Sequence, residues 1–203
     1  MTPFSRRAFA TAAMASLVAG CGGHPAQQTT AAPRSGGRPS PTPVQAARPL
    51  PRSVPVGLRI PAIGVDTPVI RLGLAPDGSV RVPPVTAHDR AGWYRHSPTP
   101  GQLGPSVILG HVTVGAYGDG VFRHLARLRR GDRIVARLEN GTAAQFAVSA
   151  VRTVPKADFP ADEVYGDVDR PELRLITCGG PRSGDGYLDN VLVFAALTSS
   201  DGP

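Results

Sequence analysis

The sequence predicts an all-β domain, a barrel or a sandwich, from Val56 to the C-terminus. Two observations predict it. Seven or eight short strand-like runs recur along this part of the chain, with turn residues such as Gly, Pro, Asn and Asp between them. Only residues 122–128 have helical character, because Phe122, Leu125 and Leu128 recur at a spacing of three.

The first four expected strands differ in how their apolar residues are arranged. Residues 57–61 and 67–70 are brief runs that contain β-branched side chains. Residues 79–82 alternate polar and apolar side chains, which is typical of a strand with one buried face. Residues 106–109 are a mostly apolar run of the kind found in a fully buried strand.

The other four expected strands include the clearest hairpin of the chain. Residues 133–138 and 144–151 flank Asn140-Gly141, a dipeptide that favours the tight turn of a β-hairpin. Residues 173–177 and 191–195 complete the set. We therefore expect a small β domain with one or two short helices.

Composition and charge exclude several classes of protein. A length of 203 residues suits one domain, and two Cys residues cannot form a disulfide scaffold or a four-cysteine zinc site. No stretch approaches the roughly 18 apolar residues of a transmembrane helix. Six of the 22 cationic residues precede Val56, and the remaining 16 are balanced by 15 acids. Because the net charge of +7 belongs mainly to the N-terminal segment, we expect no nucleic-acid partner.

Residues 1–21 are expected to be an export signal. Arg6-Arg7, with a Phe two positions on, resembles a twin-arginine signal, and the apolar segment that follows is too short to span a bilayer. Residues 17–21 resemble the bacterial lipoprotein box, in which Cys21 would receive a diacylglyceryl group. The alternative is an ordinary signal with a chance Cys at its end. Lipidation would anchor the protein to the extracytoplasmic face of the membrane.

Residues 22–55 are expected to be a disordered tether. They contain eight Pro, no acid and no aromatic residue. Such a segment buries too little apolar surface to offset the entropy of ordering it. The folded domain is therefore expected to span residues 56–203.

Cys178 is the first candidate for chemistry. It follows the apolar run 173–177 and precedes Gly179-Gly180, so we expect it at a strand end where a loop opens. If Cys21 is lipidated, Cys178 is the only free thiol of an exported domain. An unpaired Cys is a liability in an oxidising compartment, so its presence there indicates a function. The alternative is a buried structural Cys. A thiol is only slightly ionised at neutral pH and needs a nearby base to act as a nucleophile.

His111 is the candidate base among the five histidines. His24 lies in the expected tether, His88 and His96 lie in a turn-rich segment, and His124 lies in the expected short helix. His111 instead follows Gly110 at the end of a buried-type strand, a position that matches that of Cys178. A structural His is the alternative.

Several segments of this chain resemble the sortases. The histidine segment, the cysteine segment and the last strand carry the resemblance, at residues 105–112, 173–180 and 190–195. Cys178-Gly179-Gly180 and the later Asp189-Asn190-Val191 resemble the class F sortases of actinobacteria, as do Gly92-Trp93-Tyr94 and Pro100-Gly101. The similarity covers residues 56–198 and has His before Cys, as in that family.

The resemblance implies a closed β-barrel of about eight strands and a transpeptidation without a cofactor. Cys178 would attack the Thr–Gly bond of a C-terminal sorting motif and form a thioester. His111 would act as general acid and base for the leaving and incoming amines. The implied partners are secreted proteins that carry the motif, and a peptidoglycan precursor or another amine, such as a pilin lysine, as acceptor.

One departure from the family concerns the oxyanion. Sortases carry an Arg near the start of the last strand, whereas residues 187–190 of this chain contain none. Loss of one oxyanion donor costs about 10²–10³ in rate. Arg182 is the first substitute, Arg95 is a weaker one, and Asn190 offers a side-chain amide. The alternative for Arg182 is a solvated loop residue.

Two other segments are interpreted as loops. Residues 158–172 contain six acids but no calcium-binding loop pattern, so a solvated loop is favoured over a calcium site. Residues 115–120 are glycine-rich but lack the Lys that ends a phosphate-binding loop. We expect them to shape the substrate groove.

Two other classes of protein are alternatives to a sortase, namely other cysteine enzymes of the cell wall and a non-catalytic lipoprotein. Papain-like hydrolases carry Cys before His, the reverse of this chain, and the surroundings of Cys178 do not match the Ser-x-Gly-Cys pattern of L,D-transpeptidases. A non-catalytic β-barrel lipoprotein that binds a peptide or wall component stays open, because the expected Arg is absent.

Overall fold

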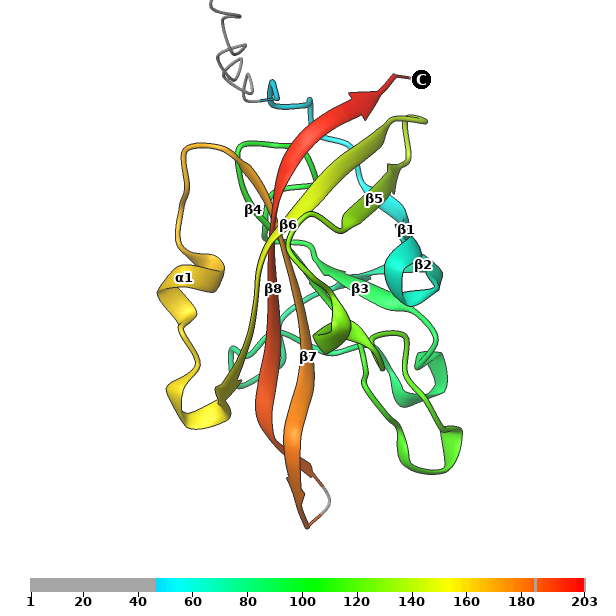
Figure 1. Cartoon of the computed structure of the whole chain (residues 1–203), viewed down its shortest axis with the longest axis vertical. Helices are drawn as coiled ribbons and strands as arrows, with labels where there is room; N and C mark the ends of the chain where they lie inside the picture. The colour runs from blue at the N-terminus through cyan, green and yellow to red at the C-terminus, as the bar shows by residue number, and fades with distance from the viewer. Residues whose placement is uncertain (1–46, 185, 203) are drawn as a thin grey trace, which may run out of the picture. The chain divides into compact units, whose positions relative to one another are not determined.

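The computed structural model describes residues 47–184 and 186–202, and in them eight strands form a closed barrel (Figure 1). Around the barrel the order is β1-β2-β3-β4-β7-β8-β6-β5, and pairing of β5 with β1 closes it. The strands are β1 Pro55–Ile60, β2 Val65–Leu72, β3 Ala91–Tyr94, β4 Gly104–Leu109, β5 Arg133–Leu138, β6 Ala143–Pro155, β7 Pro171–Ser183 and β8 Gly186–Asp201. The all-β barrel that the sequence predicts is confirmed.

Two strand pairs are parallel, β2 with β3 and β4 with β7, and the others are antiparallel. Residues along a strand point alternately to its two faces, and this alternation separates two apolar clusters. The larger one fills the barrel and includes Ile108 and Leu175. The smaller, called here the outer-face cluster, lies under helix α1 (Ala161–Tyr165) on the outer surface. Its buried members are Leu72, Val107, Leu109, Val164, Ile176 and Leu192.

Two short segments differ from the prediction. Residues 79–82 are not a strand, because Val80 makes only an isolated bridge with Leu74 and no neighbouring strand extends the pairing. The four-residue strand β3 is absent from the prediction, because Ala91-Gly92-Trp93-Tyr94 contains no β-branched residue. Its conformation comes from pairing with β2 on one side and β4 on the other.

The expected helix over residues 122–128 is only one short 3-10 turn. That turn, η4, spans Leu125–Arg127. A spacing of three is the period of a 3-10 helix, and it buries Phe122, Leu125 and Leu128 in the barrel. The other 3-10 turns in the described residues are η1 Pro61–Ile63, η2 Val85–Ala87, η3 Gly115–Tyr117 and η5 Lys156–Asp158.

The chain before β1 contacts the barrel from about Leu50 onward. The amide of Leu50 donates to the carbonyl of Gly101 at 2.8 Å, and the amide of Ser53 to Oγ1 of Thr99 at 3.3 Å. The expected signal, Cys21 and most of the expected tether lie outside the described residues. Within the described ranges, no helix combines the length and the apolar character that crossing a membrane requires.

Candidate active site

The register of β4 and β7 brings His111 and Cys178 together. These parallel strands pair Leu109 with Ile176, and the amide of Gly110 extends the ladder by donating to the carbonyl of Ile176 at 3.1 Å. His111 and Cys178 each follow that pair by two residues, so they lie at the same level of adjacent strands. Both line one pocket of about 360 Å³, called here the Cys178 pocket.

Cys178 lies inside a strand and not at its end, so that expectation is wrong. Strand β7 continues to Ser183, and Cys178 pairs with Asn190 of β8. The register then shifts between Gly179 and Arg182, because the two glycines form an irregularity in the hairpin. Gly180 has φ +72°, and a Cβ there would collide with the carboxylate of Asp189. Irregularities of this kind redirect side chains next to active sites, and the Cys178 thiol here is half-buried.

His111 is oriented by a backbone carbonyl. Its Nε2 lies 2.7 Å from the carbonyl oxygen of the buried Pro83. A carbonyl only accepts, so Nε2 carries the proton and Nδ1 is the free acceptor of the neutral ring. The backbone of His111 is packed against Gly120, where a Cβ would overlap the His111 carbonyl. The Pro83 contact therefore orients the imidazole, and the close approach of Gly120 restricts the backbone that carries it.

Two cationic side chains complete the Cys178 pocket, Arg182 and Lys156. The Arg182 guanidinium lies over the ring of Tyr187, 5.3 Å from its centroid. The Tyr187 hydroxyl in turn lies 2.8 Å from Oγ1 of Thr113, which connects the β7–β8 hairpin to the segment after His111. None of the described residues that line this pocket carries a carboxylate.

Lys156 is the residue that the sequence analysis missed. Strands β6, β8 and β7 align Val154 with Asn190 and Asn190 with Cys178. Lys156 follows Val154 by two residues, at the start of the 3-10 turn η5 that ends β6, and there it lines the Cys178 pocket. It is the only Lys in the chain. Only the pairing of three distant strands reveals it, and no local motif does.

The other two oxyanion candidates lie differently. Asn190 is directly opposite Cys178 in the ladder. Arg95 lines a separate pocket, so the prediction that it substitutes for the missing Arg beside Cys178 is wrong. The reason is the antiparallel pairing of Gly92 with Leu109, since β3 then runs away from His111 as it approaches Arg95.

Helix α1 covers the outer-face cluster close to the two candidate residues. Its Val164 packs in the same cluster as Leu109 and Ile176, which precede His111 and Cys178 by two residues. The ring of Tyr165 contacts Tyr94 and Phe159. Burial raises the pKa of Tyr165 above its usual value, with a smaller contribution from Tyr94.

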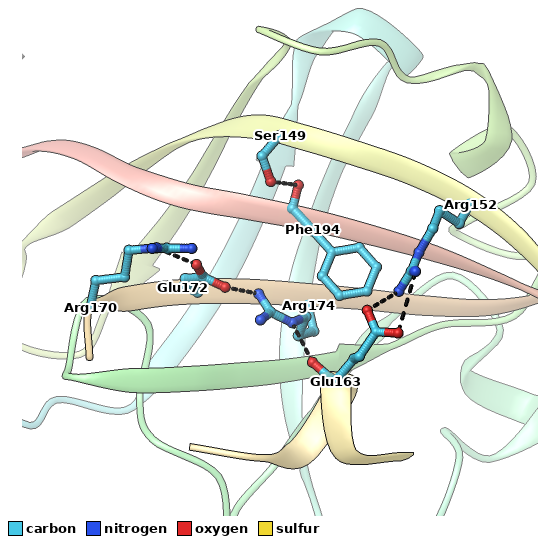
Figure 2. A network of polar contacts seen from close by, with 7 residues as sticks. All are labelled: Ser149, Arg152, Glu163, Arg170, Glu172, Arg174 and Phe194. Atoms are coloured by element: carbon cyan, nitrogen blue, oxygen red, sulfur yellow. Dashed lines mark hydrogen bonds and ion pairs between the residues drawn. The ribbon is translucent and has the colours of Figure 1, made fainter. Parts of the chain in front are cut away.

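A buried ion pair lies near the start of β7, on the outer face of that strand. The side chains of Arg174 and Glu172 are 5% and 8% exposed, with Nη1 and Oε2 2.5 Å apart. Arg170 Nε donates to the second oxygen of Glu172 (Figure 2). A buried charge is costly unless it is paired, so Arg174 depends on Glu172 for its place in the fold.

The same arginine holds α1 against the sheet. Arg174 Nε donates to the carbonyl oxygen of Glu163 at 3.3 Å, and the Glu163 carboxylate pairs with Arg152 Nη2 of β6 at 2.6 Å. Figure 2 shows Phe194 between the two guanidinium groups, and each carbon Cζ lies 4.6 Å from its ring centroid. This polar network therefore sets the position of α1.

We expect Glu172→Gln to lower the free energy of unfolding by about 1.5–3 kcal/mol, the usual worth of a hydrogen bond to a charged group. The reason is that Arg174 loses its buried counter-charge. Denaturant unfolding measures the change. Glu163→Gln is the matched control, and because its pair with Arg152 is partly exposed, it should cost less than about 1 kcal/mol. Equal losses for the two variants would contradict the role of burial.

The acidic segment of residues 158–172 is therefore not simply a solvated loop. Part of it is helix α1, and Glu163 and Glu172 are engaged with arginines. Among the described residues, no group of three or more His, Cys, Asp or Glu side chains is arranged to hold a metal ion. In the glycine-rich segment, Gly115 lines the Cys178 pocket.

The protein is thus a closed mixed β-barrel that carries a Cys and a His at the same level of two adjacent parallel strands. Comparison with protein families identifies the class more closely, because the model of the sortase domain matches residues 58–198. The chain belongs to the sortase family. A search of curated protein sequences found no match.

Solved structures share this fold. Sortase A from Listeria monocytogenes superposes with a TM-score of 0.54 at 17% identity, covering 73% of this chain and 90% of that one. The SrtA sortase from Actinomyces oris gives 0.55 at 24% identity, covering 75% and 84%. A sortase D5 transpeptidase from Clostridium perfringens gives 0.52 at 23% identity, covering 71% and 78%. At these identities the likeness shows the fold alone.

Proposed function

We propose that this sortase is a cysteine transpeptidase that cleaves the Thr–Gly bond of a sorting signal and transfers the acyl group to an amine. The observation that carries the proposal is the register that sets His111 beside Cys178 in one pocket. We further propose that it is of the class F type. Cys178-Gly179-Gly180 and Asp189-Asn190-Val191 support that subtype by resemblance.

The reaction balances with the groups of this pocket. The Cys178 thiol gives its proton to Nδ1 of His111, and the resulting thiolate attacks the Thr carbonyl. The C–N bond breaks, and the His111 imidazolium passes that proton to the leaving Gly amine. The product is a thioester on Cys178. An incoming amine then attacks the thioester and gives its proton to His111, and the C–S bond breaks to restore the thiolate.

Two cations serve the oxyanion in this proposal. Arg182 and Lys156 both line the Cys178 pocket, where the start of β8 supplies no Arg. A positive group that faces the developing negative charge stabilises the transition state. Arg182 is held by Tyr187, whereas Lys156 makes none of the ion pairs found between described residues.

We expect Arg182→Gln to lower kcat/KM for thioester formation by about 10²-fold. Lys156→Met should lower kcat/KM by about 10-fold. The loss in the double variant should be smaller than the product of the two single losses, because both cations stabilise the same oxyanion. The rate ratio of Cys178 alkylation by iodoacetate and by iodoacetamide should fall in each variant, since only the first reagent is anionic. Exposed Arg133→Gln of β5 is the control. Unchanged rates in both single variants would exclude these residues.

One experiment tests the proposed function as a whole. The full chain is incubated with Leu-Pro-x-Thr-Gly-type peptides and an excess of an amine, and mass spectrometry follows the products. Cleavage after Thr, ligation of the amine and an adduct on Cys178 are expected. A varied peptide panel that yields none of them would refute the proposal.

The second candidate function is a peptide-binding barrel lipoprotein without catalysis. The observation that favours it is the start of β8, where Leu188 is 51% exposed and no Arg is present. A binder has no need of a reactive thiol. Alkylation of Cys178 therefore separates the two functions.

We also propose that the protein acts at the extracytoplasmic face of the membrane, on secreted proteins with a C-terminal sorting motif. Residues 1–21 would direct export, Cys21 would carry the lipid, and the part of residues 22–55 that precedes Leu50 would form the tether. The acceptor would be a peptidoglycan precursor or another surface amine.

Cys21→Ala tests the anchor. We expect the variant to leave the membrane fraction and to lose label from a metabolically supplied fatty acid, because two acyl chains hold a protein stably whereas none does. Cys178→Ala is the matched control, since it removes the other thiol of the chain. Retention of both label and membrane association in Cys21→Ala would contradict lipidation at this residue.

A further inference from the structure

Cys178 lines two pockets, and the walls of these pockets differ in character. The second pocket has a volume of about 320 Å³ and is called here the inner pocket. Thr177 lines it, and Thr177 lies on the same face of β7 as Leu175 of the barrel core. Cys178, Val112 and Tyr187 line both pockets. The thiol is therefore accessible from two sides.

His111 places the two amines of the proposed reaction in the Cys178 pocket. It lines that pocket and not the inner pocket. The leaving amine takes a proton from His111 and the incoming amine gives one, so each amine must come within hydrogen-bond reach of the ring. The inner pocket, whose wall includes the apolar Phe122, Ala126 and Val191, leaves room for the acyl part of the donor on the other side of Cys178.

The pocket that receives the amines is itself cationic. Lys156 and Arg182 line it, and none of the described residues around it carries a carboxylate. A primary alkyl amine is protonated at neutral pH, so two like charges repel it as it approaches. An amine with a carboxylate close by has no net charge, and its carboxylate is attracted to the same two cations. The charge of the pocket therefore discriminates between acceptors.

Both cations have donors available for a carboxylate. Lys156 makes none of the ion pairs found between described residues, and its ammonium group has three donors. The Arg182 guanidinium lies over the ring of Tyr187, a contact that leaves the N–H donors in the guanidinium plane free for other partners. The two side chains together have enough donors for an oxyanion and a carboxylate at the same time.

We propose that the Cys178 pocket selects an acceptor whose reacting amine lies within one or two residues of a carboxylate, which Lys156 and Arg182 bind. The proposal rests on the proposed function, since it names the acceptor class of that reaction. The spacing is short because one pocket holds His111 and both cations. The acceptor is indicated over the leaving part of the donor, because the leaving amine arrives covalently attached, whereas the acceptor enters from solution and depends on the pocket for its affinity.

The test compares two acceptors that differ in one charge. Gly-Gly and its isotopically labelled C-terminal amide compete for the thioester that the full chain forms with a sorting-type peptide. Mass spectrometry measures the ratio of the two ligated products. Since a peptide bond separates the amine from the altered group, the two amines have nearly the same basicity. The ratio is independent of the rate of thioester formation and of oxyanion stabilisation, which is common to both acceptors.

We expect the chain to use the acid about 5-fold more than the amide, the size of two exposed ion pairs. The preference should weaken with added salt and decrease in Lys156→Met and in Arg182→Gln. It should persist in Arg133→Gln, which alters an exposed arginine of β5 that lines neither pocket. A ratio near one, or a preference that survives in the double variant of Lys156 and Arg182, would overturn the proposal.

A second measurement needs no turnover. Gly-Gly and its amide are compared for their protection of Cys178 against iodoacetamide, which is a neutral reagent. Stronger protection by the acid, lost in the double variant, would support the proposal. If no peptide forms a thioester, that same result would count against the transpeptidase alone. Equal protection by the acid and the amide would overturn the proposed carboxylate site.

Discussion

Cys178→Ala should abolish thioester formation and amine ligation completely. Among the described residues that line the Cys178 pocket, the thiolate is the strongest nucleophile, since the hydroxyls of Thr113 and Tyr187 react far less readily than a thiolate. Mass spectrometry of the full chain with a sorting-type peptide measures the loss. The barrel should remain folded, because Cys178 is half-buried and outside both apolar clusters.

The reactivity of the same thiol separates the enzyme from the binding lipoprotein. A nucleophile beside His111 should react readily with iodoacetamide, and alkylation should remove activity in proportion. A thiol that merely fills space should react slowly, and peptide binding should survive its alkylation. Product formation that persists in Cys178→Ala would place the nucleophile elsewhere and refute this assignment.

The barrel was predictable from sequence where local pattern and tertiary pairing agree. The run of residues 106–109 is buried on both faces as β4, and the turn at Asn140-Gly141 joins β5 and β6. Where the local pattern and the strand pairing disagree, the pairing determines whether a segment becomes a strand. Ala91-Gly92-Trp93-Tyr94 becomes a strand because β2 and β4 lie on both sides, whereas the well-patterned residues 79–82 lack a partner strand.

The candidate site was predictable in its residue types and less so in its geometry. His111 and Cys178 stand out because each follows an apolar run and adjoins glycine. Sequence alone could not reveal that β7 continues through Cys178, because the hairpin depends on cross-strand bonds to β8. Lys156 was missed for a similar reason, since two intervening strand pairings bring it to the pocket. The pairing of Glu163 and Glu172 with arginines likewise has no local signal.

His111→Ala should lower kcat/KM for thioester formation by about 10²–10⁴-fold, the usual contribution of a general acid–base group. The Pro83 carbonyl keeps the proton on Nε2, so in this geometry Nδ1 is the atom that exchanges a proton with the amine. His124→Ala is the control, because that ring lies in the segment before η4 and does not line the Cys178 pocket.

An acyl donor with a better leaving group tests whether the His111 ring transfers a proton or only positions the site. An activated ester needs no proton on its departing group, and at alkaline pH a thiol ionises without the help of a base. Under these conditions His111→Ala should acylate Cys178 from such a donor at nearly the unsubstituted rate. Attack of an amine on the resulting thioester should stay slow, because that amine must still lose a proton. If the ester and the peptide donors are slowed equally, His111 positions the site and does not transfer the proton. The Pro83 contact would then be the source of its importance, since a ring fixed at Nε2 would orient the strand end beside Cys178 without taking part in the chemistry.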